Sequence, residues 1–211
     1  MPTEPSTTTH PHPTHPTLIV FGATGRTGRA IAAEAEARGI KVTAVGRTAG
    51  DITSAADVAR LAAGHDAAVA SVYDPQAAPG QFFPAVARAL ATGLPQAGVR
   101  RLITVGLASV LPTAEGPLLM DTPGYPQEWR EFYEGHAAGT EALRTAAPEG
   151  LDWAVLSPAG DFDHTGTPSG GYTLAPADAA SRITPADFAT AVVNELITPT
   201  LHGVHTGVSK E

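Results

Sequence analysis

The sequence predicts an α/β protein with a doubly wound, mostly parallel sheet between two layers of helices, a three-layer αβα fold. From residue 18 onwards, short apolar runs alternate with alanine-rich stretches of helical period, which is the order that a parallel sheet with helical crossovers requires. The apolar runs are continuous, as in strands that are covered on both faces. Right-handed crossovers between such strands place helices on both sides of the sheet.

The predicted elements follow one another with start and stop signals. The first strand is the apolar run TLIVFGA, and the first helix, GRAIAAEAEARG, stops at Gly39. Further strands are predicted at 40–47, 66–73, 100–106, 151–158 and 203–209, and further helices at 54–64, 82–98, 126–148 and 185–198. Residues 18–211 therefore form one predicted domain, and a chain of 211 residues is long enough to bury a sizeable core.

Composition and charge argue against several classes of protein. The 13 basic residues face 21 acidic ones, for a net charge of −8, so general attraction to nucleic acid or to an anionic membrane is not expected. The chain has no cysteine, which excludes disulfides, a thiol nucleophile and a cysteine-based zinc site. No apolar run reaches the roughly 20 residues that span a bilayer, and the polar start lacks the apolar core of a signal peptide. A cytoplasmic protein is expected.

The first 17 residues, MPTEPSTTTHPHPTHPT, are rich in Pro, Thr and His and have no hydrophobic period. Such a segment cannot bury enough apolar surface to offset the entropy lost on ordering, so a disordered tail is predicted for residues 1–17. His10, His12 and His15 have the spacing HxHxxH, but flexible imidazoles hold a metal ion weakly. No metal site is therefore predicted.

Three glycines with the spacing GxxGxxG lie between the first predicted strand and the first predicted helix. Gly22 permits the tight turn, Gly25 lets the backbone approach a pyrophosphate, and Gly28 lets the helix pack closely on the strand. The N-terminus of that helix offers unpaired N–H groups and the positive end of its dipole to an anion. This position in the first βαβ unit favours a dinucleotide site over a simple tight turn.

The end of the second predicted strand indicates which dinucleotide is bound. An NAD site usually has an acidic residue about 20 residues after the glycines, where it binds the ribose 2′-hydroxyl. Arg47 stands at that place, and a guanidinium pairs instead with a 2′-phosphate. NADP (NADPH) is therefore the predicted cofactor, with Thr48 adding a hydroxyl and Arg26 a second positive charge. Asp51 and Ile52 either flank the adenine, or Asp51 only caps the following turn.

Several stretches in this order resemble one protein family. The similar stretches are VFGATGRTGRAIAAEAEARGIKVTAVGR, DAAVASV, AGVRRLITVG, EALRTAAPEGLDWAVLSPA and SRITPADFATAVVNEL. The family that they resemble is the NmrA-like, NAD(P)-binding branch of the atypical short-chain dehydrogenase/reductases, which includes flavin and biliverdin-type reductases. The resemblance runs from about residue 17 to the C-terminus and implies a Rossmann-type fold with NADP across the carboxyl ends of the strands. It implies these cofactor contacts: Gly22, Ala23, Thr24, Gly25, Arg26, Thr27 and Gly28 around the phosphates, Arg47 at the 2′-phosphate, Ser71, Val72 and Tyr73 at the third strand, Val105, Gly106 and Leu107 at the nicotinamide ribose, and Pro158 and Ala159 beside the ring.

The resemblance is less complete at the residues expected to carry catalysis. Typical short-chain dehydrogenases use a YxxxK motif, in which the lysine lowers the pKa of the tyrosine so that the tyrosine can move a proton. Tyr133 occupies the tyrosine position, but Ala137 occupies that of the lysine, and His136 points about 100° away on a helix. Tyr133 is therefore expected either to donate a hydrogen bond to a substrate carbonyl or to pack as a buried aromatic residue. Ser109 is the candidate hydroxyl partner, or it only caps the backbone.

Two long loops, 111–129 and 160–181, are expected to shape a substrate pocket, since long loops at the carboxyl ends of strands are usually functional. The sequence thus predicts an NADPH-dependent oxidoreductase that transfers hydride to a small, partly apolar carbonyl, quinone or conjugated-ring substrate, with catalysis resting on placement of the nicotinamide. One alternative is an NADP(H)-binding redox sensor that contacts a partner protein. The other is an isomerase or epimerase that uses NADP without net turnover.

Overall fold

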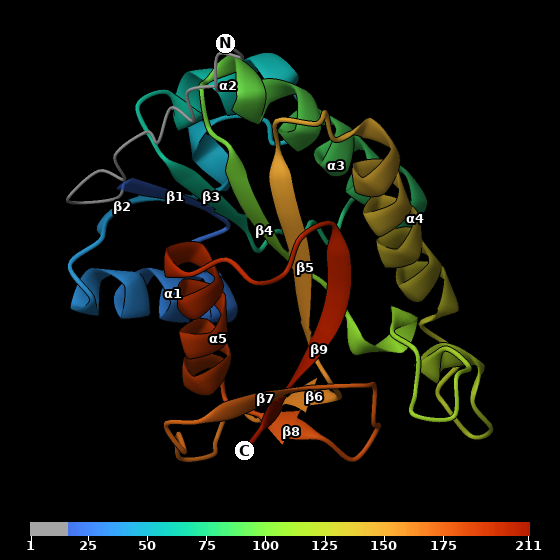
Figure 1. Ribbon diagram of the computed structural model, residues 1–211. Helices are drawn as coiled ribbons and strands as arrows, with labels where there is room; N and C mark the ends of the chain where they lie inside the picture. The colour runs from blue at the N-terminus through green and yellow to red at the C-terminus, as the bar shows by residue number, and fades with distance from the viewer. Residues whose placement is uncertain (1–16) are drawn as a thin grey trace, which may run out of the picture.

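The computed structural model describes residues 17–211, which form a seven-stranded sheet between two layers of helices (Figure 1). The strand order is β2-β1-β3-β4-β5-β9-β7, and every neighbouring pair is parallel except β9 and β7. The strands of this sheet are β1 (Thr17–Phe21), β2 (Lys41–Val45), β3 (Ala67–Ala70), β4 (Arg101–Val105), β5 (Asp152–Pro158), β7 (Tyr172–Ala175) and β9 (Val204–Lys210), while β6 (Asp161–Phe162) and β8 (Arg182–Ile183) form a separate parallel pair. The predicted doubly wound α/β fold is confirmed.

Helices cover both faces of the sheet because the inner strands carry apolar side chains on both sides. The helices are α1 (Arg26–Ala37), α2 (Ala55–Ala62), α3 (Pro79–Gln96), α4 (Arg130–Ala146) and α5 (Pro185–Ile197), with short 3-10 turns η1 (Arg47–Ala49), η2 (Ala108–Val110) and η3 (Leu119–Asp121). In β1, Leu18 and Val20 pack with α1 and α5, whereas Ile19 and Phe21 pack with α2, α3 and α4. The alternation of side chains along a strand thus builds one apolar core on each face.

The chain enters the sheet at the first residue of the predicted strand TLIVFGA. Thr17, expected as the last residue of the tail, is the first residue of β1, and its backbone N–H and hydroxyl donate to the Asp66 carboxylate at 2.7 and 2.8 Å. This anchoring comes from a residue far along the chain, so the local sequence does not reveal it. The rest of the predicted tail, including the three histidines with HxHxxH spacing, lies outside the described residues.

The segment 160–181 contains the strands β6 and β7 as well as the predicted loop. β7 pairs antiparallel with β9, with Tyr172 opposite Lys210 and Ala175 opposite Gly207, and it forms an edge of the sheet. The expectation of a loop is therefore wrong for the 4 residues of β7 and the 2 residues of β6. Their side chains are only partly buried or exposed, so this edge lacks the continuous apolar run that marks the inner strands.

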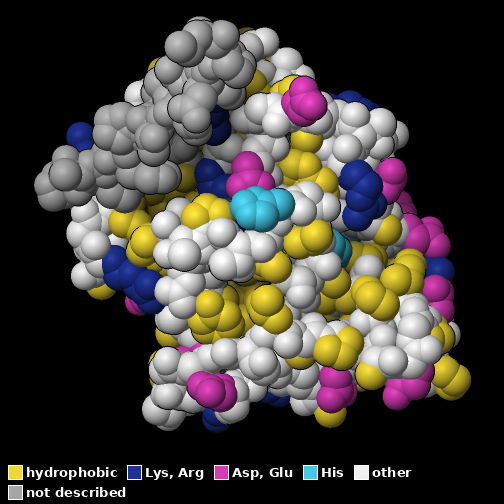
Figure 2. Space-filling model, in the orientation of Figure 1, with side chains coloured by type: hydrophobic (Ala, Val, Ile, Leu, Met, Phe, Trp, Pro, Cys, Tyr) yellow, Lys and Arg dark blue, Asp and Glu magenta, His cyan; other side chains and the backbone are white. Residues whose placement is uncertain are grey.

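The carboxyl ends of the parallel strands lie along one edge of the sheet, which is where open α/β sheets bind ligands. The glycine turn follows β1, η1 follows β2, and the segment 71–78 follows β3 at this edge. Figure 2 shows acidic, basic and hydrophobic side chains interspersed over the coloured part of one face. Within residues 17–211, no helix combines the length and the apolar character that crossing a membrane demands.

Candidate functional site

A cavity of about 660 Å³ lies at the carboxyl ends of β1, β2 and β3. Many residues expected to bind the cofactor line it: Gly22, Thr24, Gly25, Arg47, Thr48, Asp51, Ile52, Ser71, Val72 and Tyr73. The sequence did not single out the remaining lining residues, which are Phe21, Val45, Gly46, Gly50, Leu61, Asp74 and Phe82. Apolar side chains from the sheet, α2 and α3 thus meet a polar rim, a combination that suits a planar base joined to charged groups.

The three glycines of the turn differ in what their missing side chains would meet. Gly22 has a φ of +80°, and a Cβ there would lie 2.0 Å from the carbonyl oxygen of Ser71. A Cβ on Gly28 would lie 2.3 Å from the carbonyl oxygen of Gly22, so this glycine is needed for the helix to pack on the turn. Gly25 has an ordinary φ of −73°, and its Cβ would meet only the Gly22 carbonyl oxygen, at 3.3 Å. The fold requires glycine at 22 and 28, whereas at 25 glycine mainly keeps the backbone open to the cavity.

Helix α1 begins directly after this turn, with Gly25 as its N-cap and no side-chain cap from the described chain. The first turn of a helix has N–H groups without partners inside the helix, and the first turn of α1 contains no acidic residue. Arg29 donates from its guanidinium to the carbonyl oxygen of Thr24 at 2.9 Å and so holds the turn. The turn and the helix end therefore fit a diphosphate, with backbone N–H groups as donors.

Arg47 lies at the rim of the cavity, at the start of η1. Its side chain is 71% exposed, and its guanidinium lies 3.8 Å from the carboxylate of Asp74, which follows β3. Gly46 packs so closely on the glycine turn that a Cβ there would lie 3.0 Å from Thr24 Cγ2. The turn and η1 thus form one rim, where Arg47 can pair with an anionic group on a ribose.

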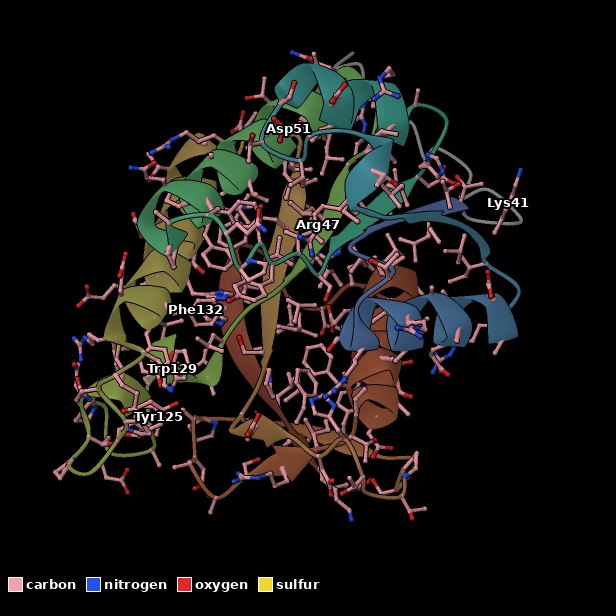
Figure 3. The ribbon with its side chains drawn as sticks, turned by 180° about the vertical axis from the view of Figure 1, so that it is seen from behind. Lys41, Arg47, Asp51, Tyr125, Trp129 and Phe132 are labelled. Atoms are coloured by element: carbon pink, nitrogen blue, oxygen red, sulfur yellow. The ribbon has the colours of Figure 1, made fainter. Side chains whose placement is uncertain are left out.

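Asp51 lines the cavity and also organises the turn that follows. Its carboxylate accepts hydrogen bonds from the N–H and the hydroxyl of Thr53 at 2.8 and 2.7 Å. Its own N–H donates to the carboxylate of Asp57 at 2.8 Å. Figure 3 shows Asp51 and Arg47 on the connections that follow β2, away from the start of α4.

The other expected cofactor residues are distributed behind the cavity and farther along the same edge. Ala23 is buried behind the turn. Arg26, Thr27 and Gly28 form the first turn of α1, whose backbone N–H groups have no acceptors within the helix. Leu107 directly precedes η2 and is partly buried, and Pro158 and Ala159 are buried at the end of β5.

Val105 and Gly106 line a smaller cavity of about 50 Å³ that also contains His136. A Cβ on Gly106 would lie 2.5 Å from Ser157 Oγ and 3.0 Å from His205 Nε2, and these two atoms are themselves 2.7 Å apart in a hydrogen bond. Burial lowers the pKa of both His136 and His205 to about 4, so both rings are neutral at neutral pH. The Ser157–His205 pair could not be predicted from the sequence, since the two residues come from different strands.

Neither of the candidate catalytic residues is among the described residues that line the cavity of about 660 Å³. Tyr133 is 7% exposed and belongs to a small apolar cluster with Met120, and its ring centroid lies 5.5 Å from that of Tyr125. Burial raises the pKa of Tyr133, and the negative charge of Glu128 raises it further, so the phenol keeps its proton at neutral pH. Ser109 is fully buried, and its hydroxyl has no hydrogen-bond partner within residues 17–211.

The two long loops that were expected to shape a substrate pocket contact each other. The N–H of Ala177 donates to the carbonyl oxygen of Pro112 at 2.9 Å. A cavity of about 480 Å³ is lined by Thr113 and Leu119 from the first loop and by Pro176 and Asp178 from the second, together with Ala159. Ala159, expected beside the nicotinamide, therefore lines a cavity between the loops.

Comparisons with known proteins agree with this geometry. The profile of a family described as NAD(P)H-binding matches residues 22–199. A Bacillus subtilis protein, the uncharacterized YwnB, is 33% identical over an alignment of 198 residues, with coverage of 85% of this chain and 92% of that protein.

Solved structures extend the similarity over most of the fold. A Burkholderia pseudomallei protein, provisionally described as exported, is 31% identical with a TM-score of 0.80 and coverage of 92% of this chain and 99% of that one. A Streptococcus pneumoniae protein, provisionally described as an NADH-flavin reductase, is 28% identical with a TM-score of 0.76 and the same coverage. A Bacteroides thetaiotaomicron protein, provisionally described as an epimerase, is 26% identical with a TM-score of 0.78, covering 92% of this chain and 97% of that one.

Proposed function

Because the chain belongs to the family described as NAD(P)H-binding, we propose that it is an NADPH-dependent oxidoreductase that transfers hydride to a small, partly apolar carbonyl, quinone or conjugated-ring compound. One observation carries the proposal: the glycine turn and Arg47 line the same cavity of about 660 Å³. The relative provisionally described as an NADH-flavin reductase supports the reductase class. That description gives NADH, so the preference for NADPH rests on Arg47.

The residues present fit such a cofactor. The open backbone at Gly25 and the uncapped start of α1 would hold the diphosphate, and Arg47 would hold the 2′-phosphate. Ile52 and Phe82 offer apolar contact to the adenine. Val105, Gly106 and Ala159 remain the proposed neighbours of the nicotinamide half, which would supply a hydride when bound.

We further propose that the protein acts by placing the acceptor rather than through a Tyr–Lys pair. Tyr133 is buried with a raised pKa, and Ala137 offers no cation that would lower it. Ser109 is completely buried in η2. Placement of two reactants can by itself supply a large share of a rate enhancement, so neither hydroxyl is assigned a proton transfer.

Two alternatives have some support. The absence of a cation at Ala137 suits a redox sensor that binds NADP(H) and does little chemistry. The relative provisionally described as an epimerase suits an enzyme that uses NADP without net turnover. Both alternatives would bind NADP(H) in the same cavity of about 660 Å³ as the reductase. They differ from the reductase because neither consumes NADPH in net turnover.

Calorimetric titration with NADPH and with NADH at one fixed ionic strength tests the cofactor assignment. A panel of carbonyl, quinone and flavin acceptors, followed as loss of absorbance of the reduced nicotinamide, then tests the reaction. Tight NADPH binding with turnover supports the reductase. Tight binding without turnover on any acceptor favours the sensor or the epimerase, and absence of binding removes the whole proposal.

A further inference from the structure

The connection between β2 and α2 forms much of the rim of the cavity of about 660 Å³, which is here called the nucleotide cavity. Residues 46–54 of this connection are here called the rim segment. The following members of the rim segment line the nucleotide cavity: Gly46, Arg47, Thr48, Gly50, Asp51 and Ile52. Figure 3 labels two of them, Arg47 and Asp51. The position of the rim segment therefore decides where the proposed contacts to the 2′-phosphate and the adenine lie.

The rim segment consists of two backbone turns joined at Gly50. The first turn, 46–49, is closed by a backbone hydrogen bond of 3.2 Å between its end residues, and the second turn, 51–54, is closed by one of 3.0 Å. The first turn carries Arg47 and the second carries Ile52. The angle between the turns at Gly50 therefore sets the distance between the residue proposed for the 2′-phosphate and the residue proposed for the adenine.

Two charged side chains of α2 hold these turns. Arg60 donates from its guanidinium to the carbonyl oxygen of Ala49 at 3.3 Å, at the end of the first turn. Asp57 accepts a hydrogen bond from the N–H of Asp51 at 2.8 Å, at the start of the second turn. Arg60 also donates to Asp57 Oδ1, from Nη2 at 3.0 Å and from Nε at 3.3 Å. Asp57 and Arg60 are here called the α2 clamp, because together they bridge the joint between the two turns.

The α2 clamp lies directly against this joint. A Cβ on Gly50 would lie 2.9 Å from Arg60 Nη2 and 3.1 Å from Asp57 Oδ2. The hydrogen bond from the Asp51 N–H, and then the Arg60 guanidinium, hold the pKa of Asp57 below its ordinary value. Asp57 is therefore charged at neutral pH, and its hydrogen bonds are of the stronger, charge-assisted kind.

We propose that the α2 clamp positions the rim segment and so helps to select NADPH, although neither of its residues is among the described residues that line the nucleotide cavity. The inference rests on the proposed function. The side chain of Arg47 is 71% exposed, so its pairing with a phosphate has to overcome the freedom of a long side chain. A fixed backbone beneath Arg47 reduces the ordering that binding requires.

The two residues of the α2 clamp have separable effects on the two cofactors. Arg60 holds the first turn, so its contribution concerns the 2′-phosphate, which NADH lacks. Asp57 holds the second turn as well as Arg60, so its contribution also concerns the adenine, which both cofactors carry. Arg60 is thus the residue whose loss should change the preference between the cofactors.

Calorimetric titration with NADPH and with NADH tests the α2 clamp without reference to turnover. Arg60→Ala should weaken NADPH binding roughly three- to tenfold, as the added ordering of one turn predicts, and should leave NADH binding unchanged. Asp57→Ala should weaken the binding of both cofactors. Arg144→Ala is the matched control, because it removes another ion pair of i,i+3 spacing, with Glu141 on α4. It should leave both affinities unchanged.

Arg60→Lys separates positioning from charge. Lysine keeps the positive charge near the proposed 2′-phosphate but lacks the guanidinium fork that bridges Asp57 and the carbonyl oxygen of Ala49. It should therefore weaken NADPH binding nearly as much as Arg60→Ala does. Full NADPH affinity in Arg60→Lys, with a loss in Arg60→Ala, would mean that Arg60 attracts the phosphate through its charge and would overturn the inference.

A double-mutant cycle shows whether the α2 clamp acts through Arg47. In the Arg47→Ala background, Arg60→Ala should cause no further loss of NADPH affinity, because the side chain that the clamp positions is gone. A further loss of the same size as in the wild-type background would mean that Arg60 acts independently of Arg47. That result would overturn the inference.

The outcomes separate this inference from the proposed function. If Arg47→Ala weakens NADPH binding and Arg60→Ala does not, the α2 clamp is overturned and the preference for NADPH stands. If the wild type binds both cofactors equally tightly and Arg47→Ala has no effect, the preference and the clamp are both overturned. Selective NADPH binding that Arg60→Ala reduces, without turnover of any acceptor, would support the clamp and favour the sensor or the epimerase over the reductase.

Discussion

The guanidinium of Arg47 lies 3.8 Å from the carboxylate of Asp74. These residues follow β2 and β3, which flank β1 in the sheet, so the pair spans the strand that leads into the glycine turn. Both side chains line the nucleotide cavity. A 2′-phosphate bound to Arg47 would therefore have a carboxylate close by, so both residues should influence the proposed preference for NADPH.

Replacing Arg47 should change the cofactor preference. Arg47→Ala removes a charge-assisted hydrogen bond to the 2′-phosphate, so the NADPH affinity should fall about ten- to hundredfold while the NADH affinity stays the same. Arg47→Asp should invert the preference, since a carboxylate repels the phosphate and can accept from a ribose hydroxyl. Calorimetry with both cofactors measures this. If Arg47→Asp still favours NADPH at unchanged affinity, the assignment of Arg47 is wrong.

Replacing Asp74 should raise the affinity for NADPH, which is the opposite of the effect expected for Arg47→Ala. Asp74→Asn keeps the size of the side chain, removes a negative charge near the 2′-phosphate and frees Arg47 from a partly exposed ion pair. Such pairs are worth about 0.2–1 kcal/mol, so NADPH should bind up to roughly fivefold more tightly, with NADH unaffected. The gain should shrink as salt is added, because exposed charges are screened. A weaker NADPH affinity in Asp74→Asn would mean instead that Asp74 holds Arg47 in its binding position.

Two glycines of the same turn should respond differently to alanine. In Gly28→Ala the new Cβ would lie 2.3 Å from the Gly22 carbonyl oxygen, so the free energy of unfolding should fall by about 1–3 kcal/mol, as for other overpacked sites. Gly25 already has a φ that alanine adopts. A Cβ added there would lie 3.3 Å from the Gly22 carbonyl oxygen, which needs only a small shift. Gly25→Ala should therefore fold nearly as well.

The same Gly25→Ala protein should nevertheless bind NADPH at least roughly tenfold more weakly, because the added methyl group stands where the backbone approaches the diphosphate. Denaturant titration and calorimetry on both variants separate folding from binding. Full NADPH affinity in Gly25→Ala would show that the diphosphate lies elsewhere.

The sequence predicted the parts of the site that depend on local backbone chemistry. The glycine turn and Arg47 were found because each must sit directly after a strand, and the structure places them in one cavity. Leu61 and Phe82 were not predicted to line it, since their place depends on how α2 and α3 pack on the sheet. The strand β7 was missed for a related reason: Leu174 is 45% exposed, so an edge strand lacks the apolar run that identified the inner strands.

Acid should destabilise the fold through its buried histidines. Burial holds the pKa of His136 and of His205 at about 4, below the ordinary value of about 6.5. As the pH falls, the histidines of the unfolded chain therefore take up protons at a higher pH than those of the folded protein. The neutral rings make their full contribution to the free energy of unfolding above pH 6.5, and this contribution is lost as the pH falls toward 4. Denaturant titrations at pH 7.5 and pH 5 should differ by roughly 1–2 kcal/mol for each histidine.

A substitution at His136 tests whether this histidine causes the loss of stability at pH 5. His136→Phe keeps an aromatic ring against Phe83 and cannot titrate, so the difference between pH 7.5 and pH 5 should shrink. His202→Gln, which replaces a side chain that is 61% exposed, should leave the difference as in the wild type. An equal loss of stability in all three proteins would mean that His136 does not contribute, which leaves His205 and other groups as the source.

Tyr133→Phe should leave turnover nearly intact. The hydroxyl belongs to a buried residue with a raised pKa, so it is a poor base at neutral pH, and the ring packs with Met120 and close to Tyr125. Phenylalanine keeps that packing, so kcat with any accepted substrate should change by less than about threefold, whereas loss of a proton-transfer group typically costs about a hundredfold or more. Tyr133→Ala is the matched control, since it should lower the melting temperature through the cavity it leaves. A large fall in kcat for Tyr133→Phe, with unchanged KM and melting temperature, would restore the phenol to the reaction as a donor to the acceptor.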